Sequence, residues 1–168
     1  NKVVAQLKHN HYVHCHSFSQ DKKILVTCDQ SFLYFWDSMT GNKLKEFRVN
    51  MTSDSIKISF STDSSMMVLG SDDHGRSSNP NVKVFNINGE ILNSYCHPYG
   101  ATDVTFSPDS KSIIVTGGTT VLIDLTTKEQ KALANYADSG YYMNEVHVSA
   151  SGKSIIECVR PRNDIRNI

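Results

Sequence analysis

The sequence predicts an all-β chain built from one four-stranded unit that recurs along its length. Three observations support this: a phrase repeated at nearly constant spacing, apolar runs too short for helices, and turn-forming residues between those runs. The 168 residues are 39 % apolar and 20 % charged, which is ordinary for a globular protein. The 17 basic residues balance the 17 acidic ones. Nucleic-acid surfaces usually need a concentrated basic face, so we expect nucleic acid to be contacted only indirectly, if at all.

The recurring phrase combines an apolar anchor with a polar turn. It reads HSFSQDKK at 16–23, ISFSTDSS at 58–65, VTFSPDSK at 104–111 and VHVSASGK at 146–153. The anchors lie 42, 46 and 42 residues apart, at Phe18, Phe60, Phe106 and Val148. Periods of this length are typical of repeat architectures.

Short apolar runs fill the rest of each unit. The runs after the phrase are 23–28, 66–71, 112–117 and 154–159; the next are 32–37, 82–86 and 120–124; the last are 43–49, 90–96 and 131–136. They are rich in Val, Ile, Phe and Tyr and are bounded by Gly, Asp, Asn or Ser, which favours strands. Each unit therefore predicts four antiparallel strands. A four-stranded sheet repeated at about 42 residues is typical of a β-propeller blade.

Two longer stretches resemble the WD-repeat propellers, and the resemblance covers essentially the whole chain. They are LVTCDQSFLYFWDSMTGNKLKEF at 25–47 and VTFSPDSKSIIVTGG at 104–118. In that family a His stands nine residues before the first-strand Phe, as His9 and His97 do here. The family's Trp-Asp pair is present once, as Trp36-Asp37, so the repeats are degenerate.

The resemblance implies how residues 1–168 are divided. Residues 1–7 would be the outer strand of a preceding blade, and the blades would cover 8–53, 54–100, 101–141 and, in part, 142–168. With a strand predicted at 164–168, about four blades are present. Because WD-repeat propellers usually have seven, we expect part of a larger propeller. The second blade carries an insertion at 71–81, which is interpreted as a solvated excursion, as a contact loop for a partner or, through Asp72, Asp73 and His74, as a metal site.

The stretch KHNHYVHCHSFS at 8–19 gathers four histidines and a cysteine. The resemblance gives His9 a structural role, hydrogen-bonded to a second-strand Ser or Thr and to an Asp in the following turn. Thr27 and Asp29 are the candidates, with Trp36 packing over them, and His97 is the second structural histidine. His11 is assigned to a loop.

His14 and His16 share one face of a strand, about 6.5 Å apart. Such a pair can bind zinc if a third ligand converges, and the sequence offers none. Aligned on the anchor, His16 falls at the inward core position held elsewhere by Ile58, Val104 and Val146. The competing hypothesis is an enzyme-associated propeller, either a peptidase cap or a metal-dependent lactonase-like protein, with His14 and His16 at the channel mouth.

WD-repeat propellers mostly act as rigid platforms, and partners dock on the face where the innermost strands start. The matching positions lie six and four residues before each anchor: Tyr12, His14, Asp54, Ile56, Thr102, Tyr142 and Asn144. We therefore expect partner proteins at these residues. The expected function is a non-catalytic scaffold within a multiprotein assembly, of the translation-initiation, ciliary, trafficking or RNA-processing kind.

Motifs of other functional classes are missing from the sequence. There is no GxSxG, HExxH or phosphate-binding loop, so no catalytic residue, cofactor, metal or small-molecule substrate is expected. No run approaches the roughly 20 apolar residues that cross a bilayer, so no membrane partner is expected. The four cysteines lie far apart and form no CxxC pair, which disfavours a structural zinc site. We expect an intracellular, cytoplasmic location.

Overall fold

The computed structural model describes residues 3, 5–29, 31–49, 51, 55–73, 79–137, 139 and 141–161, with only the main chain at 141, 142 and 144. The described residues form strands and no helix, so none of them forms a helix that could span a membrane. The strands are β1 (Cys15–Phe18), β2 (Ile24–Cys28), β3 (Phe32–Asp37), β4 (Lys43–Arg48), β5 (Ile56–Phe60), β6 (Met66–Ser71), β7 (Val82–Asn86), β8 (Ile91–Tyr95), β9 (Asp103–Phe106), β10 (Ser112–Thr116), β11 (Thr119–Asp124), β12 (Gln130–Asn135), β13 (Tyr141–Val148) and β14 (Ile155–Pro161).

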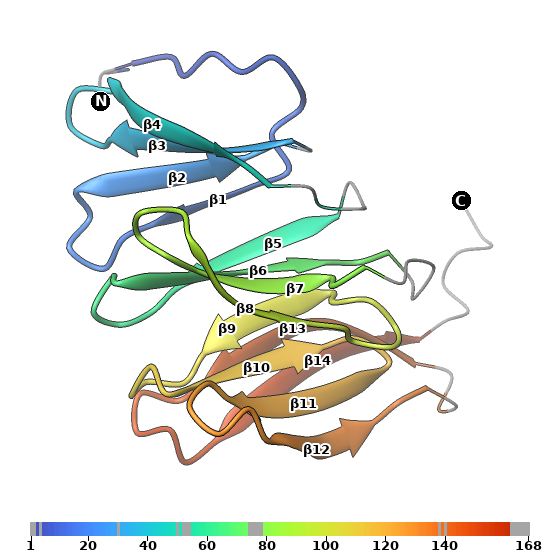
Figure 1. The fold of residues 1–168 in the computed structure, drawn as a ribbon. Helices are drawn as coiled ribbons and strands as arrows, with labels where there is room; N and C mark the ends of the chain where they lie inside the picture. The colour runs from blue at the N-terminus through green and yellow to red at the C-terminus, as the bar shows by residue number, and fades with distance from the viewer. Residues whose placement is uncertain are drawn as a thin grey trace.

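The strands form three four-stranded sheets and one two-stranded sheet, all antiparallel. The orders are β1-β2-β3-β4, β5-β6-β7-β8, β9-β10-β11-β12 and β13-β14, so each strand pairs with its neighbours in sequence. The sheets stand side by side as an arc, with β1, β5, β9 and β13 in contact along its inner edge (Figure 1). The predicted all-β fold of propeller blades is therefore confirmed.

Apolar side chains fill the spaces between neighbouring sheets. The cluster between the first two sheets includes Leu33, Phe35, Met67, Leu69 and Phe85, all buried. The cluster between the second and third sheets is formed in the same way by valines and isoleucines of β6, β7, β9 and β10. Because β6 lies between the two clusters, Met67 and Leu69 face one cluster and Val68 the other, and consecutive apolar residues of this strand are all buried.

The recurring phrase forms the hairpin after each innermost strand. A serine hydroxyl donates to an aspartate two residues later in three of the hairpins: Ser19 to Asp21 at 2.7 Å, Ser61 to Asp63 at 2.7 Å and Ser107 to Asp109 at 2.6 Å. These hydroxyl bonds are the largest cause that lowers the pKa of each carboxyl below its ordinary value. The repeated aspartates are thus turn residues, as the sequence indicated.

Neighbouring hairpins are also joined to each other. The Gln20 amide donates to Ser64 Oγ at 2.9 Å, and the Thr62 amide donates to Ser110 Oγ at 3.0 Å. Between the third and fourth hairpins, Pro108 stands at the position of the donating amide and Gly152 at the position of the accepting serine. Proline has no amide hydrogen and glycine has no hydroxyl, so the same hydrogen bond cannot form. Gly152 adopts a φ of 70°, and its Cα faces the Pro108 ring. These two described hairpins therefore meet by packing, while their strands are joined by the Val146 amide, which donates to Asp103 Oδ2 at 2.9 Å.

The two ends of the arc differ from the sequence-based expectations. Residues 3 and 5–7, predicted as an outer strand, carry no strand assignment, because the described chain offers them no third strand to pair with. They lie over the open face of the first sheet, which we define as the face turned away from the second sheet. There Val3, Ala5 and Leu7 line a pocket together with Trp36. The strand predicted at 164–168 lies outside the described residues.

The open face of the first sheet also explains an incorrect prediction for His16. We expected a core position, but His16 is exposed. The neighbouring anchor Phe18 is 42 % exposed, against 4 % for Phe60 and 6 % for Phe106. The physical reason is the same for both residues: no described sheet covers this face of β1.

Candidate functional site

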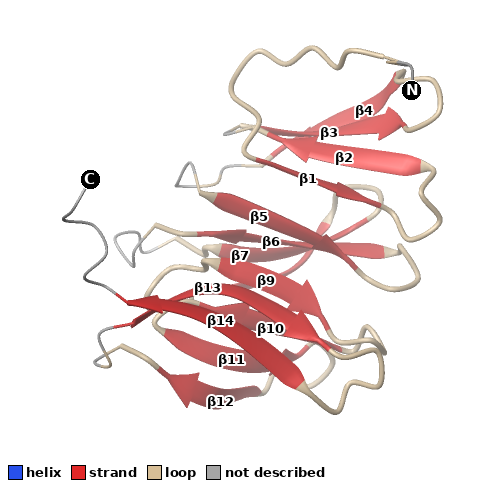
Figure 2. Cartoon of the chain, turned by 180° about the vertical axis from the view of Figure 1, so that it is seen from behind, coloured by secondary structure: helices blue, strands red, loops and turns tan. Residues whose placement is uncertain are grey.

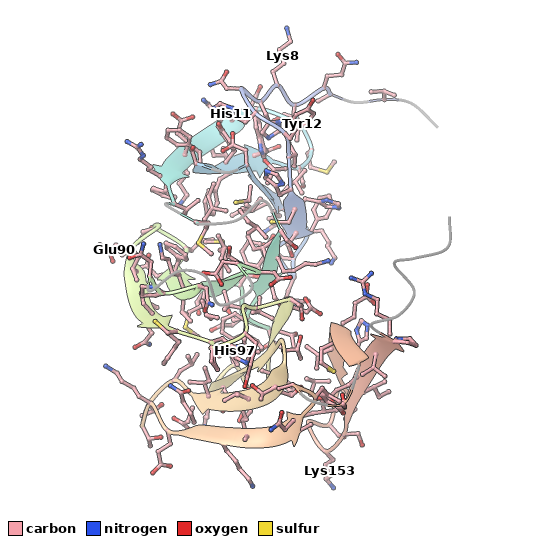
Figure 3. The ribbon with its side chains drawn as sticks, turned by 90° about the vertical axis from the view of Figure 1, so that its right-hand side faces the viewer. Lys8, His11, Tyr12, Glu90, His97 and Lys153 are labelled. Carbon is pink, nitrogen blue, oxygen red and sulfur yellow. The ribbon has the colours of Figure 1, made fainter. Side chains whose placement is uncertain are left out.

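The candidate site is the loop face, which we define as the side of the arc carrying the loops that lead into β1, β5, β9 and β13. These innermost strands run in the same direction in Figure 2, where β1, β5 and β9 all point from left to right. Their leading loops therefore emerge on one side of the arc. Figure 3 labels His11 and Tyr12 on the loop before β1, and His97 on the loop before β9.

A directed chain of hydrogen bonds anchors the first leading loop. His9 Nδ1 lies 3.1 Å from the Leu7 carbonyl oxygen, which can only accept, so Nδ1 carries the proton. His9 Nε2 then accepts from Thr27 Oγ1 at 2.7 Å, and Thr27 Oγ1 accepts from Trp36 Nε1 at 2.8 Å. Each of the three polar groups is paired, which ties the loop to β2 and β3.

Asp29 belongs to a second, adjacent network. Its carboxylate accepts from the amides of Ser31 at 2.9 Å and Phe32 at 2.8 Å, and from the Tyr34 hydroxyl at 2.8 Å. Burial opposes ionisation of Asp29, but these three donors together lower its pKa below the ordinary value. Burial and Asp29 raise the pKa of Tyr34 to about 12.

The structure thus brings His9, Thr27 and Trp36 together and gives Asp29 other partners among the described residues. The His9 ring contacts Tyr34 edge-on at 4.9 Å between centroids. Tyr34 was missed by the sequence analysis. Its place beside Trp36 could have been predicted, because residues 34 and 36 of a strand point to the same face.

His97 is held differently, although it occupies the matching place before β9. Its amide donates to Asn81 Oδ1, and its carbonyl accepts from Asn81 Nδ2, both at 2.8 Å. His97 Nε2 lies 3.1 Å from the Thr119 carbonyl oxygen. Burial is the main cause that lowers the pKa of His97. Asn81 lies at the end of the predicted insertion and had no signal in the sequence.

Glycine makes room for His97. A Cβ atom at Gly117 would clash with the carbonyl oxygen of Gly100 and would lie 2.8 Å from Cε1 of the His97 ring. Gly117 stands at the position that Asp29 occupies in the first repeat. The third repeat therefore replaces a polar turn by close packing of the imidazole against the backbone.

The structure places the predicted partner-binding residues in different environments. Tyr12 is 88 % exposed, and His14 and Thr102 are half-buried, with the Thr102 hydroxyl donating to the Thr116 carbonyl at 3.2 Å. Ile56 is 2 % exposed and packs in the core between the first two sheets, so the prediction that it contacts a partner is wrong. Asp54 lies outside the described residues. Tyr142 and Asn144 lie on β13, and only their main chain is described.

The insertion is anchored at both ends within the described residues. Asp73 and Asn81 are buried, and Asn81 Nδ2 lies 3.3 Å from Asp73 Oδ1. Residues 74–78 lie outside the described part of the chain. The two buried ends fix where this loop leaves the loop face.

The histidine pair gains no further ligand in the structure. His14 is half-buried and His16 is exposed, on alternate positions around Cys15. Within the part of the chain that the structure describes, no group of three or more His, Cys, Asp or Glu side chains is placed to hold a metal ion. The arrangement therefore gives the metal-dependent hypothesis no support beyond the two histidines.

Comparisons with known proteins agree with this geometry. Residues 1–37 match the family model for the WD domain, G-beta repeat. The fold is that of a WD-repeat β-propeller. Among solved structures, the β-propeller domain of Cps50 (Swd1) from Myceliophteria thermophila matches 94 % of this chain with a TM-score of 0.75. Sequence identity is 12 %, so this likeness describes the fold alone.

The chain covers 51 % of that propeller domain, or about half of its length. A search of curated proteins gave no significant match. The resemblance of the repeats to the WD-repeat propellers is confirmed, as is the description of the chain as an arc of propeller blades.

Proposed function

We propose that this propeller arc is a non-catalytic scaffold that binds other protein subunits of a multiprotein assembly through its loop face. The observation that carries the proposal is the pairing of an anchored histidine with an exposed tyrosine on two leading loops. His9 is followed by Tyr12, and His97 is followed by Tyr99, which is 47 % exposed. Tyrosine is enriched among residues that dominate binding energy at protein interfaces.

Anchoring lowers the entropic cost of using these tyrosines. The loop before β1 is fixed by the His9 hydrogen bonds, and Val13 beside Tyr12 is also exposed. The Tyr99 ring packs on the backbone at Gly118, where a Cβ atom would lie 2.6 Å from Tyr99 Cγ. Loops held in one conformation before binding lose less conformational freedom on binding.

The proposal places the scaffold inside the cell, in the cytoplasm. None of the four cysteines forms a disulfide in the structure. Disulfides are rare in reducing compartments, so reduced thiols suit that environment. No cofactor, membrane or small-molecule substrate forms part of the proposal.

Affinity enrichment with matched variants tests this function. The tagged chain and the variants Tyr12→Ala, Tyr99→Ala and Met39→Ala would be compared by quantitative mass spectrometry of bound proteins. Met39 is an exposed apolar residue in the turn between β3 and β4, on the opposite side of the arc. We expect proteins retained by the wild type and by Met39→Ala to fall about tenfold with either tyrosine variant, which corresponds to ~1.4 kcal/mol. Equal retention by all four chains would contradict a role for the loop face.

A further inference from the structure

Two cysteines stand directly opposite each other on neighbouring strands of the first sheet. In the antiparallel pairing of β1 with β2, Cys15 is the partner of Cys28. Directly opposed residues of antiparallel strands have Cα atoms about 4.5–5.5 Å apart. Disulfides in proteins usually join Cα atoms about 4.4–6.8 Å apart. The backbone therefore already has the spacing that a disulfide between these residues needs.

The two side chains also lie on the same face of the sheet. Cys28 is fully buried in the cluster between the first two sheets, and Cys15 is half-buried and packs against that cluster. A hydrogen bond with the Cys15 side chain is the largest cause that raises the pKa of Cys28, followed by burial. The Cys28 thiol also donates to the Asp29 carbonyl oxygen at 3.1 Å. Cys28 is thus held in its protonated form beside a more accessible thiol.

The other two cysteines do not share this arrangement. Cys96 and Cys158 are exposed, and neither is opposite another cysteine in the described strand registers. A cysteine pair in register on adjacent strands therefore occurs once among the described residues.

We propose that Cys15 and Cys28 form a thiol–disulfide site, with Cys15 as the thiol oxidised by a hydroperoxide and Cys28 as the resolving thiol. The Cys15 thiolate attacks the peroxide, the O–O bond breaks, and a sulfenic acid forms while hydrogen peroxide leaves its second oxygen as water. Cys28 sulfur then attacks Cys15 sulfur, and the S–O bond breaks to release another water. Together the two thiols lose two electrons and two protons, which reduce one hydrogen peroxide to two waters.

The position of the site gives the disulfide a structural consequence. Cys15 directly follows His14, and Cys28 directly precedes Asp29, with the His14 amide donating to the Cys28 carbonyl at 2.8 Å. The bond would join the start of β1 to the Asp29 turn, close to the leading loop that carries Tyr12. The inference does not depend on the proposed scaffold function, because it concerns two residues of the first sheet alone. Since attack by Cys28 requires its thiolate, the second step should quicken as the pH rises.

The test uses the Cys96→Ser/Cys158→Ser chain, which keeps only Cys15 and Cys28. After treatment with hydrogen peroxide, we expect intact mass spectrometry to show a monomer lighter by about 2 Da, the mass of the two protons and two electrons lost. Peptide mapping should join residues 15 and 28, and dithiothreitol should reverse the change. The midpoint of thermal unfolding should rise by about 6–12 °C in the oxidised chain, the size expected for a closed loop of this length.

The matched control is the Cys15→Ser/Cys96→Ser/Cys158→Ser chain, which should show no such loss of mass. Addition of oxygen to the first variant without loss of about 2 Da, or an unchanged mass, would overturn the proposal. If the serine variants fail to fold, alkylating the exposed Cys96 and Cys158 of the native chain before oxidation gives the same readout. A disulfide mapped to any pair other than Cys15 and Cys28 would also overturn it.

Discussion

His9 and His97 occupy the same place in their repeats, yet different chemistry holds each of them. His9 is half-buried, and its ring belongs to a chain of side-chain hydrogen bonds with Thr27 and Trp36. His97 is buried, and it is held mainly through its backbone by Asn81 and through a carbonyl oxygen at Thr119. Both arrangements tie a leading loop to the sheet that follows it.

The second repeat has apolar side chains at the three matching positions. Met51 stands where the two histidines stand, Leu69 replaces Thr27, and Phe85 replaces Trp36. All three pack in or against the cluster between the first two sheets. Each leading loop must be held against its sheet, so the fold fixes where the contact between loop and sheet lies. The side chains that make this contact, polar or apolar, differ between the repeats.

Of the three contacts between a leading loop and its sheet, the apolar contact of the second repeat should lose the most stability on mutation. We expect Phe85→Ala to lower the free energy of unfolding by about 3–5 kcal/mol, because a fully buried ring is lost and a cavity remains. Urea denaturation would measure the change. The control is Phe18→Ala, whose ring is 42 % exposed on the open face and should cost about 1 kcal/mol. Equal losses at the two positions would contradict the account of covered and uncovered sheet faces.

The polar contact of the first repeat should depend on the hydroxyl of Thr27. Thr27→Val keeps the shape of the side chain but leaves His9 Nε2 and Trp36 Nε1 without their shared partner. We expect a loss of about 2 kcal/mol in unfolding free energy, since each unpaired buried group costs about 1–3 kcal/mol. The exposed Thr126→Val serves as the control in the same denaturation experiment and should change stability by less than about 0.5 kcal/mol. A Thr27→Val chain as stable as the wild type would show that the network does not hold the loop.

The smallest effect is expected from acid acting on His97. Its pKa in the folded chain is lowered from 6.5, mainly by burial. The unfolded chain therefore binds a proton first as the pH falls, and stability is lost below about pH 6.5. The slope from this one group is at most ~1.4 kcal/mol per pH unit. Urea denaturation between pH 5 and 7 should show a shallower slope for His97→Gln than for the wild type, and identical slopes would contradict the assignment.

The repeats made the fold predictable, whereas the partners of individual residues were less accessible. The spacing of Phe18, Phe60 and Phe106 predicted the sheets, because each anchor marks the end of an innermost strand. The burial of Ile56 and the exposure of His16 were not predicted. Both depend on whether another sheet covers that face, and a repeat alignment treats all blades as equally covered.

The two histidine anchors illustrate the same limit. The link from His9 to Thr27 and Trp36 followed from the resemblance to the WD-repeat propellers, in which a histidine at this position binds a second-strand Ser or Thr. The hydrogen bonds between the Asn81 side chain and the His97 backbone join an inserted loop to a later loop. No local pattern indicates such a contact, because it depends on how the insertion folds back.

The central claim is that anchored leading loops present tyrosines to partner proteins, and site-specific photo-crosslinking tests it most directly. A benzophenone amino acid would replace Tyr12 in one chain and Met39 in another, and both would be irradiated in cells. The account predicts that the probe at position 12 crosslinks to a discrete protein that the probe at position 39 does not capture. The same crosslinked products from both positions, or none from position 12, would contradict it.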